Sequence, residues 1–282
     1  HRDSAVAIFR RCPNHPQIDK GRIMKLFKYA VIAVLGLMVA TTVAKADSRL
    51  KEILDKGVLR VGTTGDWNPM TMKDPATNTY KGYDIDMMTE LAKDLGVKVE
   101  FVATDWKTLV SGVVSNKYDL TGSASLSMKR AKVAGYSPSY FSLATVPLTL
   151  KKNLSKFQDW GDLDKPNVTV AATLGTTQEQ QVKRFFPSAN KKIIEAPARD
   201  FQEVLAGRAH AHITSNVEAG KLVEKYPQMA VVPVKQARAR TPIAMLLPQD
   251  DQVWINYINH WIALKKERGL FDKLAAKWQI AN

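Results

Sequence analysis

The chain has 282 residues, with 41 Lys or Arg against 27 Asp or Glu, and a formal charge of +14 at pH 7. Eight of these basic and two of these acidic residues precede Asp47, which leaves 33 basic and 25 acidic residues from there on, a charge of +8 without a long basic run. This pattern argues against a nucleic-acid partner. The single cysteine, Cys12, also precedes Asp47, so the rest of the chain has no disulfides, thiol nucleophiles or cysteine metal ligands.

Residues 24–46 have the pattern of a secretory signal peptide. Two lysines precede an uncharged apolar run over residues 29–40, and a small-x-small triplet ends at Ala46. The run is about a dozen residues long, whereas a transmembrane helix needs about 20. We expect cleavage after Ala46 and export to the periplasm. Because Asp47 offers no thiol to a lipid, we expect a soluble mature chain, and residues 1–23 are interpreted as an upstream, non-native leader.

Helical and strand patterns alternate after the signal peptide, which predicts α/β sheets. In chain order the patterns predict helix 49–55, strand 58–62, helix 84–94, strand 98–102 and helix 106–115, then strand 167–172, helix 177–185, strand 192–195, helix 201–206, strand 209–214 and helix 216–224, and last strand 241–247, helix 253–266 and helix 271–278. The second group of elements predicts a second α/β unit.

The turn after the first predicted strand, residues 63–69, brings hydroxyls, a carboxylate and an indole together. Gly65 allows the chain to turn with a positive φ, and Pro69 prevents the turn from continuing as a strand or helix. Such a strand end suits a small polar ligand. Asp84 and Asp86, which follow, have a structural interpretation as the N-cap and a first-turn residue of the next helix.

A series of short motifs runs through the chain in a defined order. They are Gly62–Pro69, Gly82–Asp86, Asp105–Trp106, Lys117–Leu120, Lys129–Ala131, Tyr136–Tyr140 and Leu174–Gln178. In this order they resemble the family 3 extracellular solute-binding proteins, the periplasmic polar amino-acid receptors of ABC importers. The resemblance implies a type II periplasmic binding protein fold, in which two α/β lobes joined by a double-strand hinge close around a ligand. It places the first lobe at 47–145 with a return at 241–282, and the second lobe at 146–240.

In the first lobe, the resemblance places two indoles and a guanidinium around the ligand. Trp67 and Trp106 would enclose its apolar part, since indoles give a large contact area at little entropic cost; the alternative is that they are core residues. Arg130 would clamp a ligand carboxylate with two parallel hydrogen bonds, which lysine cannot reproduce, unless it is a solvated surface residue. Ser123 and Ser125 would add donors, and which serine of the loop faces the ligand stays open.

In the second lobe, Thr176, Thr177 and Gln178 begin a predicted helix, where free N–H groups and hydroxyls favour an anion. A simple N-cap is the alternative, and both roles are compatible. The family usually has an aspartate for the ligand ammonium where this chain has Ser215. Either Glu218 or Asp66 would replace it, or the ligand has no ammonium.

The turn at residues 63–66 also resembles the cyclohexadienyl dehydratases, exported enzymes with the same fold that act on prephenate or arogenate. In those enzymes a glutamate acts as general acid at the position of Gln178, and an amide cannot donate a proton in the same way. Glu179 is one residue further and about 100° around the helix, so it should face elsewhere. The sequence therefore favours a receptor without catalytic residues, with the dehydratase as the alternative.

Other chemistry has little support in the sequence. His210 and His212 alternate on a predicted strand, but no third ligand is near them, so we expect no metal. Phosphate-binding and nucleophile-elbow motifs are absent from the sequence, and we expect no cofactor. The resulting hypothesis is a monomeric receptor that captures a small carboxylate-bearing solute, an amino acid or a relative, and delivers it to the membrane permease of an ABC transporter.

Overall fold

The computed structural model describes residue 21 and residues 47–280. The predicted signal peptide and its cleavage site lie outside these residues. The compact unit that carries the fold begins at Asp47. Among the helices of the described residues, none is long and apolar enough to cross a membrane.

The first lobe begins with a parallel sheet of three strands, in the order β5-β1-β6. A second, antiparallel sheet of strands β2, β3 and β4 follows β1 in the chain. The elements are α2 (Arg49–Lys56), β1 (Val58–Thr63), β2 (Asp66–Trp67), β3 (Thr71–Lys73), β4 (Tyr80–Lys81), α3 (Tyr83–Leu95), β5 (Lys98–Ala103), α4 (Leu109–Val114), β6 (Leu120–Thr121), β7 (Ser123–Ser125), α5 (Met128–Ala131) and β8 (Gly135–Tyr136).

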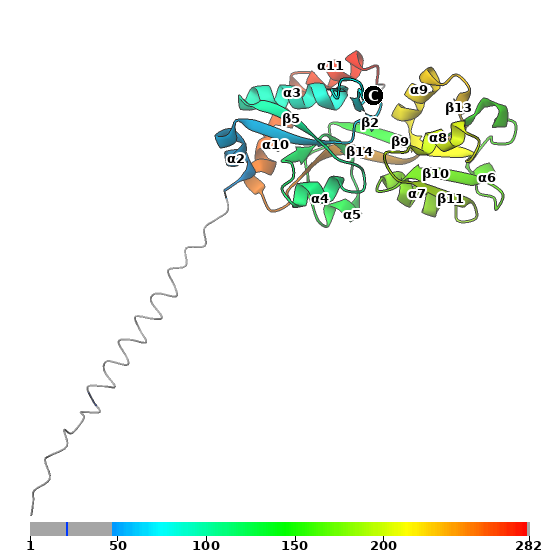
Figure 1. The fold of residues 1–282 in the computed structure, drawn as a ribbon, viewed down its shortest axis with the longest axis horizontal. Coiled ribbons are helices and arrows are strands. Elements are labelled where there is room, and N and C mark those ends of the chain that lie inside the picture. Colours follow the sequence, from blue (N-terminus) through cyan, green and yellow to red (C-terminus); the bar gives the residue numbers. More distant parts are fainter. Residues whose placement is uncertain (1–20, 22–46, 281–282) are drawn as a thin grey trace, which may run out of the picture. The chain divides into compact units, whose positions relative to one another are not determined.

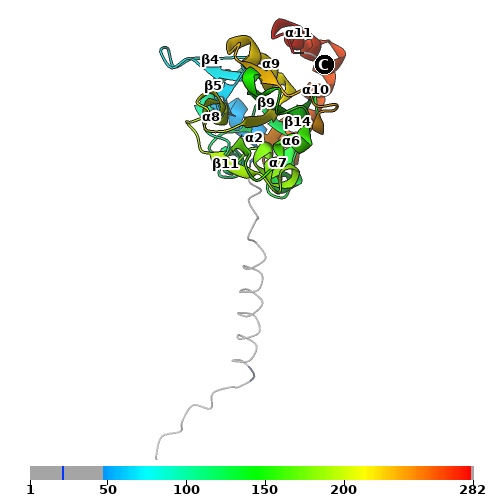
Figure 2. The same cartoon turned by 90° about the vertical axis from the view of Figure 1, so that its right-hand side faces the viewer.

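The second lobe contains three parallel strands in the order β11-β10-β12, with antiparallel strands beyond β12. Helices α7 and α9 lie on opposite sides of its strands (Figures 1 and 2). Its elements are η1 (Lys151–Asn153), α6 (Trp160–Leu163), β10 (Thr169–Thr173), α7 (Thr177–Phe185), β11 (Asn190–Ile194), α8 (Asp200–Leu205), β12 (Ala211–Ser215), α9 (Asn216–Lys225) and β13 (Met229–Val231).

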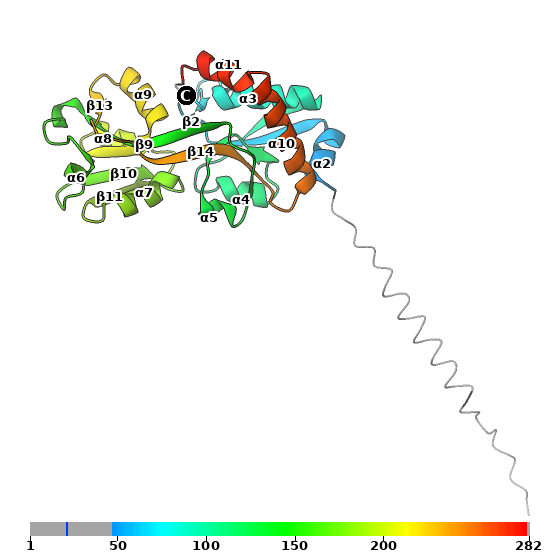
Figure 3. The same ribbon diagram turned by 180° about the vertical axis from the view of Figure 1, so that it is seen from behind.

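Two long antiparallel strands, β9 (Phe141–Leu150) and β14 (Arg238–Leu247), connect the lobes (Figure 3). Strand β9 pairs with β12 and β13 of the second lobe, and β14 pairs with β7 and β8 of the first. The burial of β14 follows its path, because its first five residues are exposed or half-buried and its last five are buried. These strands form the double-strand connection that the family resemblance implied.

The last two helices, α10 (Gln252–Glu267) and α11 (Leu270–Lys277), pack on the first lobe, where α11 lies beside α3 (Figures 1 and 3). The indole of Trp254 donates to the carbonyl oxygen of Asp119 over 3.0 Å. Asp251, the N-cap of α10, also accepts the N–H of Arg49 over 2.6 Å, so the start of α10 is fixed to the start of α2. The predicted architecture of two α/β lobes is confirmed.

The hydrophobic cores divide along the same line. The largest cluster of buried side chains draws on residues 53–143 and 243–280, and a smaller one joins α4 to β14. Two other clusters are confined to residues 146–232. Each lobe therefore has its own core, and Val217 of the second lobe packs against the core of the first.

Three local predictions differ from the structure. Asp84 is not a helix cap: α3 is preceded by Gly82, and the buried Asp84 carboxylate accepts the N–H and hydroxyl of Ser123 over 2.9 and 2.5 Å. Burial raises the pKa of Asp84 to about 7 against the effect of these hydrogen bonds. The helix predicted from Trp106 begins only at Leu109, and β9 was not among the strands predicted from local patterns.

Candidate ligand-binding site

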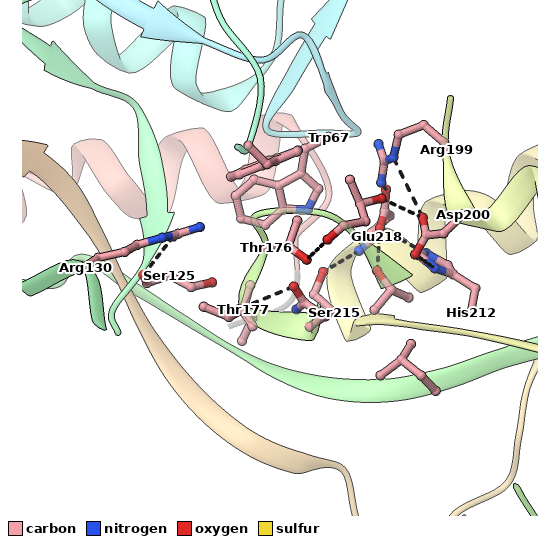
Figure 4. Close-up of a pocket in the computed structure, with 16 residues that line it drawn as sticks. Trp67, Ser125, Arg130, Thr176, Thr177, Arg199, Asp200, His212, Ser215 and Glu218 are labelled. Carbon is pink, nitrogen blue, oxygen red and sulfur yellow. Dashed lines mark hydrogen bonds and ion pairs between the residues drawn. The ribbon is translucent and has the colours of Figure 1, made fainter. Parts of the chain in front are cut away.

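A cavity of about 50 Å³ lies where side chains of both lobes meet (Figure 4). The first lobe and β9 contribute two indoles, a guanidinium, a hydroxyl and one aliphatic side chain. The second lobe contributes a polar wall. The lining consists of Trp67, Trp106, Ser125, Arg130, Leu143, Thr173, Thr176, Thr177, Gln178, Arg199, Asp200, His212, Ile213, Thr214, Ser215 and Glu218.

Arg130, in α5, is 7% exposed and extends toward the cavity (Figure 4). Its Nη1 donates to the carbonyl oxygen of Ser125 and its Nη2 to that of Gly175, each over 3.1 Å. Within residues 47–280, no carboxylate forms an ion pair with it. Burial lowers its pKa, but a guanidinium remains protonated at neutral pH. The cavity therefore contains a buried positive charge whose protein partners are neutral carbonyl groups.

The two indoles pack edge to face, with ring centroids 5.8 Å apart and an interplanar angle of 71°. Trp67 is 7% exposed and belongs to the core of the first lobe, yet it also lines the cavity. Trp106 donates its indole N–H to Asp66 Oδ1 over 3.0 Å. The core and cavity interpretations of Trp67 therefore apply together.

The start of α7 forms one wall of the cavity. Thr176 is the N-cap, whose hydroxyl accepts the N–H of Glu179, and Gln178 lines the cavity. Glu179 faces elsewhere: its Oε2 accepts the N–H of Gly175 over 2.9 Å and its Oε1 lies 2.9 Å from Lys183 Nζ. Burial would raise the pKa of Glu179, but these partners lower it. The predicted divergence of Gln178 and Glu179 is confirmed.

Gly175 fits closely against the first lobe. It has φ +83°, and a Cβ at this position would lie 2.5 Å from the carbonyl carbon of Trp106. A side chain would therefore clash with backbone atoms of the first lobe. Only glycine combines this φ with such a close approach.

A cluster of charged residues, of which Asp200, His212 and Glu218 are buried and Arg199 is half-buried, forms the other end of the cavity (Figure 4). His212, 2% exposed, lies with Nδ1 2.6 Å from Asp200 Oδ2 and Nε2 3.3 Å from Glu218 Oε2. Arg199 Nη2 donates to Glu218 Oε1 over 2.7 Å, and Thr214 donates to Glu218 Oε2. The cluster therefore uses both oxygens of Glu218.

The ionisation of this cluster follows from its pairing. Burial alone would lower the pKa of His212, but Asp200 and Glu218 outweigh it and raise the pKa to about 9. Burial would raise the pKa of Glu218, but Arg199 and His212 hold it well below its ordinary value. At neutral pH the imidazolium, the guanidinium and the carboxylate of Glu218 are therefore all charged.

Arg199 also joins this cluster to the first lobe. Its Nη1 donates to the carbonyl oxygen of Asp66 and lies 3.5 Å from Asp66 Oδ2. Burial raises the pKa of Asp66 despite the opposing charge of Arg199. A further, exposed link between the lobes runs from Lys107 Nζ to Glu195 Oε1 over 2.8 Å.

The structure brings together most of the residues that the sequence suggested. Those in the cavity lining are Trp67, Trp106, Ser125, Arg130, Thr176, Thr177, Gln178 and Ser215. Two lie outside it. The hydroxyl of Ser123 contacts Asp84 and, over 2.8 Å, Tyr140, whereas Asp66 contacts Trp106 and Arg199 and lines a neighbouring cleft.

Sequence reasoning missed Arg199 and Asp200 as site residues and treated Glu218 only as a possible replacement for an aspartate. One signal was available: Thr173 and Thr214 lie at the carboxyl ends of neighbouring parallel strands, where binding sites of α/β sheets form. His210 and His212 do not share a partner, because His210 Nδ1 accepts the N–H of Thr169 over 2.9 Å and His212 bonds to Asp200.

Comparison with known proteins places this site in a family. The family model for bacterial extracellular solute-binding proteins, family 3, matches residues 59–281. The chain belongs to this family. The family predicted from the sequence motifs is therefore confirmed, and this family 3 protein has the two-lobed fold of type II periplasmic binding proteins.

Proteins similar to this chain include an enzyme and binding proteins. The cyclohexadienyl dehydratase of Pseudomonas aeruginosa is 29% identical over 257 residues, which cover 90% of this chain and 95% of that one. The L-cystine-binding protein TcyA of Bacillus subtilis is 23% identical and covers 92% of this chain and 97% of its own. The crystal structure of AncCDT-1, an ancestral amino acid-binding protein and precursor of cyclohexadienyl dehydratase, has 36% identity and a TM-score of 0.76, covering 82% of this chain and 99% of that one.

Proposed function

We propose that this protein is a receptor that captures a small carboxylate-bearing solute, an amino acid or a relative, and delivers it to the permease of an ABC importer. One observation carries the proposal: Arg130 is a buried guanidinium in the cavity, and its protein hydrogen bonds go to the neutral carbonyl groups of Ser125 and Gly175. A buried charge is costly without a counter-ion, and a carboxylate matches the planar fork of an arginine. Family membership supports the same function.

In the proposed cycle, the lobes close on the solute through the double-strand hinge of β9 and β14. We place the lobe boundaries at residues 146 and 240, with the first lobe at 47–145 and 241–282. Arg130 and Arg199 each contact both lobes, so a solute that binds between them stabilises the closed form. At the start of α7 the hydroxyl of Thr177, which lies 3.3 Å from Gln178 Oε1, can turn to donate to an anion, whereas the hydroxyl of Thr176 donates to the carbonyl oxygen of Thr173.

The proposed location of the protein is the periplasm, to which the signal peptide at residues 24–46 would direct it before cleavage after Ala46. A monomer suffices, because one chain supplies both walls of the cavity. The proposal includes the membrane permease as the only protein partner and requires no metal or cofactor.

A ligand screen by thermal shift and calorimetry tests this function. Carboxylates, their amides and their esters are compared at equal concentration, because an amide or ester keeps the shape but removes the charge that Arg130 would bind. A ligand at 100 times its dissociation constant adds about 2.7 kcal/mol to the free energy of unfolding. Stabilisation by carboxylates alone supports the receptor. Equal stabilisation by the neutral derivatives contradicts it.

The second candidate is a cyclohexadienyl dehydratase, favoured by the 29% identity to that enzyme along most of both chains. The chain has the amide of Gln178, which carries no acidic proton, in the cavity wall at the position that the sequence resemblance assigns to the general acid. Glu179, next to it, is held by Gly175 and Lys183. Receptor and enzyme differ in that only the enzyme would turn over prephenate.

A further inference from the structure

The carboxylates around the cavity already have cationic partners within the protein. Glu218 has one oxygen on Arg199, at 2.7 Å, and the other beside His212 and Thr214. Asp200 has one oxygen 2.6 Å from His212 and accepts the hydroxyl of Thr173 on the other. These two carboxylates therefore face protein groups on both oxygens.

The two carboxylates of this cluster that line the cavity, Asp200 and Glu218, are matched by two cations. Arg199 and His212 supply two cations, since the pKa of His212 is about 9, and Asp200 and Glu218 supply two carboxylates. Asp66 lies outside the cavity lining, with one oxygen on the indole of Trp106 and the other 3.5 Å from Arg199. The cluster therefore offers a ligand no carboxylate that lacks a partner.

The remaining charge in the lining is positive. Arg130, at the opposite end of the cavity, has neutral carbonyl partners, as described above. Thr177 and Ser215 lie between the two ends (Figure 4), and Gln178 also lines the cavity. All three side chains are uncharged and can donate hydrogen bonds. The Ser215 hydroxyl also accepts the N–H of Glu218 over 3.1 Å, as the N-cap of α9.

On the basis of the proposed function, we infer that the solute of this receptor carries a carboxylate but no ammonium group. A 2-oxo acid and a 2-hydroxy acid are solutes of this kind. The solute pairs its carboxylate with Arg130, and its keto or hydroxyl oxygen accepts hydrogen bonds from the neutral donors of the lining. An amino acid would bring an ammonium into a closed cavity whose carboxylates are already paired with Arg199 and His212. A buried ammonium without a counter-ion is strongly unfavourable.

Calorimetry at pH 7 on matched sets tests the inference. Each set is an L-amino acid with the 2-oxo and 2-hydroxy acids of the same carbon skeleton, and the sets cover small, branched, aromatic and acidic side chains. In every set that binds, we expect the dissociation constant of the nitrogen-free acid to be lower than that of its amino acid by about tenfold or more. An unpaired buried charge usually costs an affinity of this order. Equal or tighter binding of the amino acid overturns the inference but leaves the carboxylate receptor in place. If no member of any set binds, the receptor and the inference both fail.

A pair of variants separates charge from shape at residue 215. Asp and Asn both cap helices well, so Ser215→Asp and Ser215→Asn both preserve the start of α9, but only aspartate adds a carboxylate to the lining. We expect Ser215→Asp to shift the affinity ratio about tenfold toward the amino acid relative to Ser215→Asn, which has a neutral amide in place of the carboxylate. A ratio that Ser215→Asp leaves unchanged, with a folded variant by circular dichroism, overturns the inference.

Discussion

The guanidinium of Arg130, in the first lobe, donates to the carbonyl oxygen of Gly175, in the second lobe, over 3.1 Å. The same guanidinium is the cavity charge that has only neutral partners in the described part of the chain. A ligand anion on Arg130 would thus bind at a residue that already touches both lobes. Ligand affinity and lobe closure are therefore expected to depend on the same two residues.

Replacement of Arg130 by lysine should weaken binding of the carboxylate ligand without unfolding the protein. Lysine keeps the charge but loses the planar fork, and loss of a charge-assisted pair costs on the order of 1.5 to 3 kcal/mol, or about 10- to 150-fold in affinity. The measurement is calorimetry with the best ligand of the screen. Arg184→Lys, at an exposed arginine of α7 that lies over Phe185, is the matched control and should bind like the wild type. Unchanged affinity in Arg130→Lys would remove this residue from the site.

Replacement of Gly175 by alanine should weaken the closed state. The new Cβ would lie 2.5 Å from the backbone of Trp106, and φ +83° is itself unfavourable for alanine by about 1 to 2 kcal/mol. Gly207→Ala is a close control, since Gly207 has φ +73° but open space at the Cβ position. Both variants should lose similar stability without ligand, and only Gly175→Ala should lose affinity, by about tenfold or more. Equal affinities in the two variants would show that the contact with Trp106 does not matter for binding.

Local signals in the sequence were sufficient for some elements. Helix α7 has the predicted bounds, Thr177–Phe185, because Thr176 is a strong N-cap signal and the helix is amphipathic. Strand β9 was not predicted from local patterns. Most of its residues are buried, so polar and apolar side chains do not alternate regularly along it, and it contains Pro147. Its neighbouring strands on both sides come from distant parts of the chain, which local patterns do not reveal.

The site shows the same division. Arg130 and Thr176 were recognised because they belong to local motifs. Arg199 was not recognised, since its partners Asp66 and Glu218 are 133 and 19 residues away in the chain and no local motif indicates that they meet. Contacts of this kind follow from the order of the strands and the closure of the lobes, which periodicity alone does not specify.

The ion pairs of His212 should make stability depend on pH. Its pKa of about 9 in the folded protein exceeds the ordinary value of 6.5, so the stabilisation is complete below about pH 6.5 and is lost as the pH rises through 9. The stabilisation is at most on the order of 3 kcal/mol. We expect the difference in unfolding free energy between the wild type and His212→Asn to shrink between pH 6 and pH 9.5, measured by urea denaturation.

Thr173→Val provides the control for this measurement. It removes a hydroxyl of the same cluster, a group without an ionisable proton in this range, which donates to Asp200 over 3.0 Å. Its cost in unfolding free energy should therefore be similar at both pH values. A difference for His212→Asn that is constant between pH 6 and pH 9.5 would mean that folding does not raise the pKa of His212.

The purified protein should not convert prephenate or arogenate to phenylpyruvate or phenylalanine. A dehydratase must protonate the departing hydroxyl, and Gln178, at the general-acid position suggested by resemblance, has no acidic proton to give. Gln178→Glu should add little activity, because a useful general acid also needs a raised pKa. A carboxylate at residue 178 would lie in the first turn of α7, where the positive end of the helix dipole lowers its pKa. The assay is the appearance of product by absorbance and chromatography, with Gln180→Glu, at a residue of the same helix outside the cavity lining, as the control. Wild-type turnover in the enzymatic range of about 1 to 1,000 per second would contradict the receptor function and favour the dehydratase, with a proton donor other than Gln178. Prephenate that binds without turnover would instead agree with a receptor for nitrogen-free carboxylates.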